Sequence, residues 1–195
     1  MKLNKELFSQ DKYTEHTLSM SFLKANIVGT LFPIPLVSIF VIMFAWVEYS
    51  LNRKGFSISW NAQFLLWLLV FYASAFLLIA LHELVHALFF LRGCENRWKS
   101  IRFGIKSATP YCHCKEVLPL NLYRHSLLAP LWLICLPLAI VALLTGHGLI
   151  FLLTVIMIFG SGGDLAIFWS LRKYKGNRTY VWDMEDAVGC IVYVL

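Results

Sequence analysis

Long apolar runs dominate the hydrophobic pattern of this chain. Four of them, at about residues 27–47, 64–91, 127–145 and 149–171, are long enough to cross a bilayer, which takes about 20 helical residues. No internal repeat and no low-complexity segment separates them. The pattern therefore predicts a single polytopic membrane domain, residues 1–195, with about four transmembrane helices.

A different period appears in the loop between the second and third runs. Ile101, Phe103 and Ile105 occupy every second position there, which is the period of a half-buried strand. Residues 107–110 resemble a turn, and residues 111–117 can return antiparallel. The predicted fold class is thus an all-α membrane protein with a small β-hairpin, within residues 99–117, between helices 2 and 3.

Composition agrees with lipid as the solvent of this chain. Hydrophobic residues make up 59% and charged residues 14%, whereas soluble domains are about a quarter charged. The net charge of +6 comes from basic residues beside the apolar runs and not from one continuous basic arm. Such a distribution favours anionic lipid head groups over nucleic acid as the partner of the basic residues.

The basic residues also predict the orientation in the membrane. Of the 17 Lys and Arg residues, 15 fall before the first run, in the middle loop, or after the last run. Basic residues concentrate on the cytoplasmic side of membrane proteins. We therefore expect a multi-pass protein of the cell membrane with both termini, the hairpin and the tail 172–195 in the cytoplasm. The odd number of cysteines, five, indicates reduced thiols and not a disulfide framework.

Two acidic residues, Glu83 and Asp164, lie well inside apolar runs, where ionisable groups are costly and are usually functional. His82 and His86 share a helix with Glu83 and complete an H-E-x-x-H string. A spacing of four residues places both imidazoles on one helical face, where they can hold one metal ion. The string predicts that His82 and His86 bind a single Zn²⁺ ion.

The remaining roles follow from zinc chemistry. Glu83, beside the two ligands, is the predicted general base and catalytic residue, which takes a proton from water while the metal polarises a scissile carbonyl. Asp164 is the predicted third ligand, because its depth in the fourth run falls between those of His82 and His86. The small residues at 160–163 would let its helix approach closely. His125 or Cys112 remains open as the third ligand, with Asp164 in a salt bridge or hydrogen bond instead.

A site about two helical turns inside the bilayer predicts a membrane protein or membrane-associated peptide as substrate. A helical substrate hides its amides, so the edge of the strand at Ile101, Phe103 and Ile105 is a candidate for pairing with the extended substrate. A second zinc site built from Cys94 and residues 112–114 is disfavoured, because paired zinc-binding cysteines are usually two to four residues apart.

These motifs resemble a family of small bacterial membrane proteins described as putative zincin peptidases, which pair H-E-x-x-H in one span with Gly-Gly-Asp in a later one. The matching residues are His82 to His86 and Gly162-Gly163-Asp164, and the Leu128-Ala129-Pro130 step and the tail 183–193 are also similar. More distantly, the chain is similar to site-2 proteases, although their Asp-Gly pair is here Asp164-Leu165. The resemblance implies a bacterial, zinc-dependent metalloendopeptidase.

Two other classes of protein fit the same ligands. A membrane metal-ion transporter or sensor would use His82, His86 and Asp164 to carry or detect the ion. A non-catalytic member of the same fold would keep the framework for binding alone. Glu83 distinguishes the classes, since only a peptidase needs it as a general base.

Overall fold

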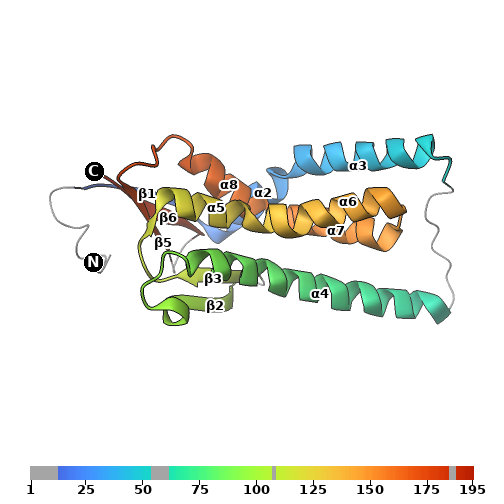
Figure 1. Cartoon of the computed structure of the whole chain (residues 1–195), viewed down its shortest axis with the longest axis horizontal. Helices are drawn as coiled ribbons and strands as arrows, with labels where there is room; N and C mark the ends of the chain where they lie inside the picture. Colours follow the sequence, from blue (N-terminus) through green and yellow to red (C-terminus); the bar gives the residue numbers. More distant parts are fainter. Residues whose placement is uncertain (1–12, 54–61, 107–108, 185–187) are drawn as a thin grey trace.

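The computed structural model describes residues 13–53, 62–106, 109–184 and 188–195. Helices run along the long axis of the molecule, and two small sheets gather at one end, together with the N-terminal strand and the C-terminus (Figure 1). We call this the sheet end.

The first apolar run forms two helices and not one. α2 (Phe22–Leu31) and α3 (Ile34–Ser50) are separated at Pro33, which lies at the start of α3. Proline has no amide hydrogen and clashes with the preceding turn, so it is tolerated at a helix start but not inside a helix. α4 (Ala62–Phe90), by contrast, is continuous and carries the H-E-x-x-H string.

The third and fourth runs are interrupted as well. α5 (Leu120–Pro130) passes through a π-helical turn, Leu131–Cys135, into α6 (Leu136–Thr145). α7 (Gly148–Gly160) and α8 (Gly162–Leu171) meet at Ser161. The breaks lie at or beside proline and glycine residues, where a helix loses hydrogen bonds or gains backbone freedom.

A glycine contact holds α2 against α8. A Cβ atom added to Gly162 would lie 1.8 Å from the carbonyl oxygen of Gly29, which no side chain could tolerate. Small residues allow helix backbones to approach this closely. The contact places α2 beside the first turn of α8, where Asp164 lies.

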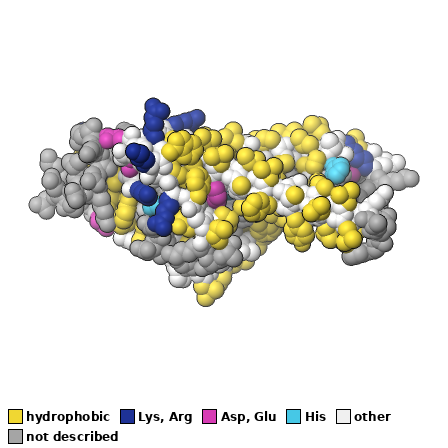
Figure 2. Space-filling view, turned by 90° about the horizontal axis from the view of Figure 1, so that it is seen from below, with side chains coloured by type: hydrophobic (Ala, Val, Ile, Leu, Met, Phe, Trp, Pro, Cys, Tyr) yellow, Lys and Arg dark blue, Asp and Glu magenta, His cyan; other side chains and the backbone are white. Residues whose placement is uncertain are grey.

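Four helical segments are long and apolar enough to cross a membrane, by length and composition: Leu23–Ser50, Gln63–Phe90, Leu120–Thr145 and Gly148–Leu171. They correspond to the four predicted runs. Their outer surfaces expose large hydrophobic side chains, with Phe76 76% and Leu144 71% exposed. Figure 2 shows hydrophobic side chains over the helical part of the visible face, with most of the visible Lys and Arg toward the sheet end and a smaller group at the opposite end.

The hairpin expected in the middle loop is present. β2 (Ile101–Lys106) and β3 (Thr109–Cys114) pair antiparallel, with a register from Ile101↔Cys114 to Lys106↔Thr109. Part of the predicted turn, residues 107–108, lies outside the described residues. β3 packs against α4 and so lies next to the H-E-x-x-H helix.

A second sheet was not predicted. β1 (Thr14–Met20), β4 (Leu118–Pro119), β5 (Thr179–Asp183) and β6 (Val188–Val194) form an antiparallel sheet in the order β1-β6-β5-β4. The class is therefore not all-α but mostly helical with two small antiparallel sheets. β6 contains five consecutive buried residues, whereas a strand with one exposed face alternates apolar and polar residues. Its sequence therefore lacks the two-residue period that predicts a strand.

Candidate metal centre

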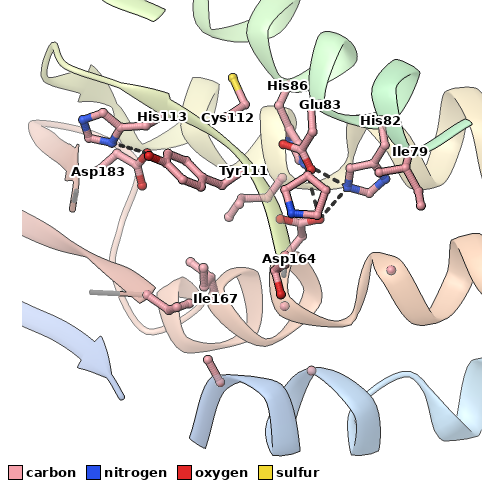
Figure 3. A pocket seen from close by; sticks show the side chains of 18 of the residues that line it. Ile79, His82, Glu83, His86, Tyr111, Cys112, His113, Asp164, Ile167 and Asp183 are labelled. Atoms are coloured by element: carbon pink, nitrogen blue, oxygen red, sulfur yellow. Dashed lines mark hydrogen bonds and ion pairs between the residues drawn. The ribbon is translucent and has the colours of Figure 1, made fainter. Parts of the chain in front are cut away.

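Three side chains from two helices converge in the interior of the bundle. His82 and His86 lie one turn apart on α4, and Asp164 lies in the first turn of α8. Figure 3 shows their polar ends pointing toward one another. Within the described residues, they are the one group of three or more His, Cys, Asp or Glu side chains able to share a metal ion, with ligand atoms within 4.8 Å of one another.

The spacing of the ligand atoms fits zinc. His82 Nε2 lies 3.1 Å from Asp164 Oδ2, and His86 Nε2 lies 3.3 Å from the same oxygen. The two Nε2 atoms are 3.1 Å apart. Around a tetrahedral zinc ion, whose bonds are about 2.0 to 2.2 Å long, neighbouring ligand atoms are about 3.3 to 3.5 Å apart. The three atoms can therefore surround zinc after shifts of a few tenths of an ångström.

The two histidines are oriented differently. His86 Nδ1 donates a hydrogen bond to the carbonyl oxygen of Ser126 in α5, at 2.9 Å. This bond fixes the neutral tautomer whose Nε2 lone pair faces Asp164, as zinc-binding histidines require. The buried Nδ1 of His82 has no hydrogen-bond partner in the described part of the chain. His82 is thus positioned through its Nε2 side alone.

Pro130 explains why the Ser126 carbonyl is available. In a regular helix that oxygen would accept the amide of residue 130, but proline has no amide hydrogen. The next amide, that of Leu131, donates to the carbonyl of Leu128. Pro130 therefore leaves the Ser126 carbonyl without a helical donor, and His86 takes the place of that donor.

Replacing Pro130 by alanine should weaken zinc binding by about 10- to 100-fold, the usual cost of losing a partner that orients a metal ligand. The new amide would compete with His86 for the Ser126 carbonyl. Isothermal titration with zinc measures the affinity, and thermal unfolding of the metal-free protein should show no loss of stability, because alanine favours the helix.

The matched control is Pro137→Ala, which adds an amide to the same helical segment, at the start of α6. It should leave zinc affinity unchanged. Equal losses of affinity in both variants would show that helix shape, and not the freed carbonyl, governs the site.

Glu83 lies beside the ligand cluster, in the wall of a cavity of about 580 Å³. The cavity is bounded by α2, α4, β3, α5, α7 and α8 and by the β5–β6 region. The backbone amide of Cys112 in β3 faces the Glu83 carboxylate. A peptide-sized space therefore adjoins both the ligand cluster and the predicted base.

The other candidate ligands lie apart from the cluster. His125 Nδ1 donates to the carbonyl oxygen of Asn121 in its own helix, at 2.6 Å. Cys112 lines the cavity without joining the three-ligand group, and burial raises the pKa of its thiol. Cys94 and Cys114 contact each other at 3.2 Å, whereas His113 pairs with Asp183, so these residues form no second three-ligand site in the described chain.

The sequence pattern did not identify Asp183, which lines the same cavity. Its carboxylate accepts hydrogen bonds from the Tyr123 hydroxyl at 2.9 Å, from His113 Nδ1 at 3.0 Å and from the Cys114 amide at 3.3 Å. These bonds tie β5, β3 and α5 together beside the site. An acidic residue in a polar tail carries no local signal of such a role.

Fold and site together define a class: a mostly helical chain with four span-length helices and an H-E-x-x-H ligand set completed by an aspartate in space. A family model described as "Putative zincin peptidase" matches residues 75–178. The chain belongs to this family, whose name implies zinc. Comparison with curated proteins and with solved structures found no match.

Proposed function

We propose that this protein is a zinc-dependent metalloendopeptidase embedded in the membrane. The observation that carries the proposal is the triangle of His82, His86 and Asp164 ligand atoms beside Glu83, in a cavity large enough for a peptide segment. Membership of the zincin peptidase family supports the same chemistry.

Each side chain has a separate task. His82, His86 and Asp164 would hold one zinc ion, which when bound polarises the scissile carbonyl and acidifies water. Glu83 accepts the proton of the attacking water and then donates it to the leaving amine. The Ser126 carbonyl keeps the His86 ring in its binding tautomer.

The proposed location follows from the helices and the charges. The ligands lie inside two segments that are long enough to span a bilayer, nearer to the sheet end than to the far turns. Most basic residues belong to the sheet end and its loops, which we place in the cytoplasm with both termini. Substrates would then be polypeptides in or at the membrane, cut near its cytoplasmic face.

A direct test uses single-span polypeptides reconstituted with the protein in liposomes containing zinc. Mass spectrometry of the new termini should place cleavage within about two helical turns of the cytoplasmic face. Zinc-independent cleavage, or cleavage of soluble polypeptides alone, would contradict the proposal.

For substrate capture we propose β3 of the hairpin, in place of the strand expected from the sequence. Ile101, Phe103 and Ile105 lie on β2 and do not line the cavity, whereas β3 does. The Cys114 amide donates to Asp183, away from β2, and the Cys112 amide faces Glu83. The alternating backbone groups of β3 that point away from β2 are therefore on the cavity side. Because the Cys112 and Cys114 amides already face carboxylates, we propose that an extended substrate donates its own amides to the carbonyl groups on this edge of β3.

Strand capture predicts a two-residue period in the substrate. Methylating alternate backbone amides of a cleaved peptide should slow cleavage by about ten-fold in one register, since one or two hydrogen bonds are lost, and should have little effect in the other. Equal effects in both registers would exclude strand pairing.

The Phe103→Pro variant separates the two strands. Phe103 is opposite Cys112, whose amide faces Glu83 and not β2, so these two residues form a pair without backbone hydrogen bonds between them. The Phe103 amide therefore points away from β3, and proline there removes a donor from the outer edge of β2 alone. Capture by β3 predicts normal cleavage by this variant. Loss of cleavage in a folded variant would return the capture site to β2.

A further inference from the structure

Two buried thiols face each other at the sheet end. Cys94 follows the C-terminus of α4, and Cys114 is the last residue of β3. Their Sγ atoms are 3.2 Å apart, and Cys114 is completely buried. Since a disulfide bond is about 2.05 Å long, joining them needs a movement of about 1 Å.

The backbone around the pair is held in place by Glu116. Its carboxylate accepts hydrogen bonds from the amides of Glu95 and Asn96, at 2.8 and 3.0 Å, and from the Ser100 hydroxyl. The segment that follows Cys94 is thus attached to the segment that follows Cys114. The sulfur contact is therefore part of a fixed local arrangement between α4 and the hairpin.

The two thiols differ in access and in acidity. Cys94 lines a surface pocket of about 290 Å³ together with Leu91, Arg97 and Trp98. The thiol hydrogen of Cys114 lowers the pKa of Cys94, and the same contact, with burial, raises the pKa of Cys114. A thiol of lowered pKa that borders a surface pocket, beside a completely buried partner, is the arrangement expected of an attacking and a resolving cysteine.

We propose that Cys94 and Cys114 are a redox-active dithiol that is oxidised by low-molecular-weight disulfides carrying carboxylates, such as oxidised glutathione. The guanidinium of Arg97 in the pocket wall would attract the carboxylates of such a molecule.

The reaction balances in two exchange steps. The Cys94 thiolate attacks one sulfur of the small disulfide, which gives a mixed disulfide and releases one thiolate that takes a proton from water. Cys114 then attacks the Cys94 sulfur, and its proton leaves with the second small thiol. Overall, two protein thiols are oxidised and one small disulfide is reduced to two thiols.

The disulfide would connect the two elements that carry the proposed active site. α4 holds His82, Glu83 and His86, and β3 packs against α4 and lines the same cavity. Cys112, whose amide faces Glu83, is two residues from Cys114. Oxidation should therefore restrict the movement of β3 relative to α4, so hydrogen exchange at the β3 amides should slow. The oxidation itself does not depend on peptidase activity.

The test treats the reduced full chain in detergent with oxidised glutathione, blocks remaining thiols with N-ethylmaleimide and maps all five cysteines by mass spectrometry. We expect one Cys94–Cys114 disulfide, with Cys94 reacting at least about ten times faster than the other cysteines. Cys114→Ser should accumulate a glutathione adduct on Cys94, and Cys94→Ser should leave Cys114 unmodified. Cys135→Ser, which removes a buried thiol of a spanning segment, should behave as wild type.

Three results would overturn the proposal. One is a glutathione adduct that forms first on Cys112 or Cys190. Another is the absence of a disulfide in the wild-type chain, which does not depend on how well any variant folds. The third is a second equivalent of zinc that is lost in both Cys94→Ser and Cys114→Ser, which would make the pair a structural metal site.

Discussion

Glu83→Gln should abolish peptide hydrolysis while leaving bound zinc in place. Glutamine keeps the size of the side chain but cannot accept the proton of the attacking water. Loss of a general base lowers rates by about 10²- to 10⁴-fold. The side chain lies beside the ligand cluster and not within it, so metal content should stay at the wild-type value. Cleavage of a reconstituted substrate and zinc analysis of the same sample measure both effects.

The same variant separates the peptidase from a metal transporter or sensor. In a transporter, Glu83 would act as a ligand or proton carrier, so its amide variant should change metal uptake or affinity. Glu48→Gln is the matched control, because Glu48 is a carboxylate at the end of another span-length segment, paired with Arg53 and away from the cavity. Near-normal cleavage by Glu83→Gln would show that Glu83 is not the general base.

Asp164→Ala should lower zinc affinity by at least about 100-fold, because it removes one of three protein ligands and the only charge among them. Asp164→Asn should bind zinc more tightly than the alanine variant but still below wild type, since a neutral amide is a poorer ligand than a carboxylate. Competition with a fluorescent zinc chelator gives the three affinities.

X-ray absorption at the zinc edge identifies which atom is lost. Wild type should show two nitrogen ligands and at least one oxygen ligand, and Asp164→Ala should lose an oxygen. Sulfur in the wild-type spectrum would indicate Cys112 as the third ligand instead. If the atoms bound to zinc are the same in Asp164→Ala as in wild type, then Asp164 only hydrogen-bonds to His82 and His86 and is not a ligand.

The sequence was most informative where a feature is local: a periodic pattern, or an ionisable residue whose burial in an apolar segment costs free energy. Four apolar runs were sufficient to predict the span-length helices, because length and hydrophobicity are local properties. His82 and His86 were predicted as ligands because a helix brings positions four apart onto one face, and Glu83 was predicted as the base because it lies beside that face. Asp164 was found because a carboxylate inside an apolar segment is costly, and the structure places it against both histidines.

Features that depend on distant partners were missed. β1 and β6 pair Thr14 with Val194 across almost the whole chain, and neither strand alternates clearly enough to predict the sheet. The role of Pro130 also depends on tertiary structure, since it requires α4 to bring His86 to the Ser126 carbonyl. The hairpin was predicted, but which of its strands faces the cavity is set by packing against α4.

Zinc content of the purified protein is the most direct test of the central claim, that His82, His86 and Asp164 form a zinc site. Wild type in detergent should contain one zinc per chain, and His86→Ala should contain almost none. His125→Ala, which changes a histidine that bonds within its own helix, should match wild type. Less than stoichiometric zinc in wild type after zinc supplementation, with no further loss in His86→Ala, would contradict the claim.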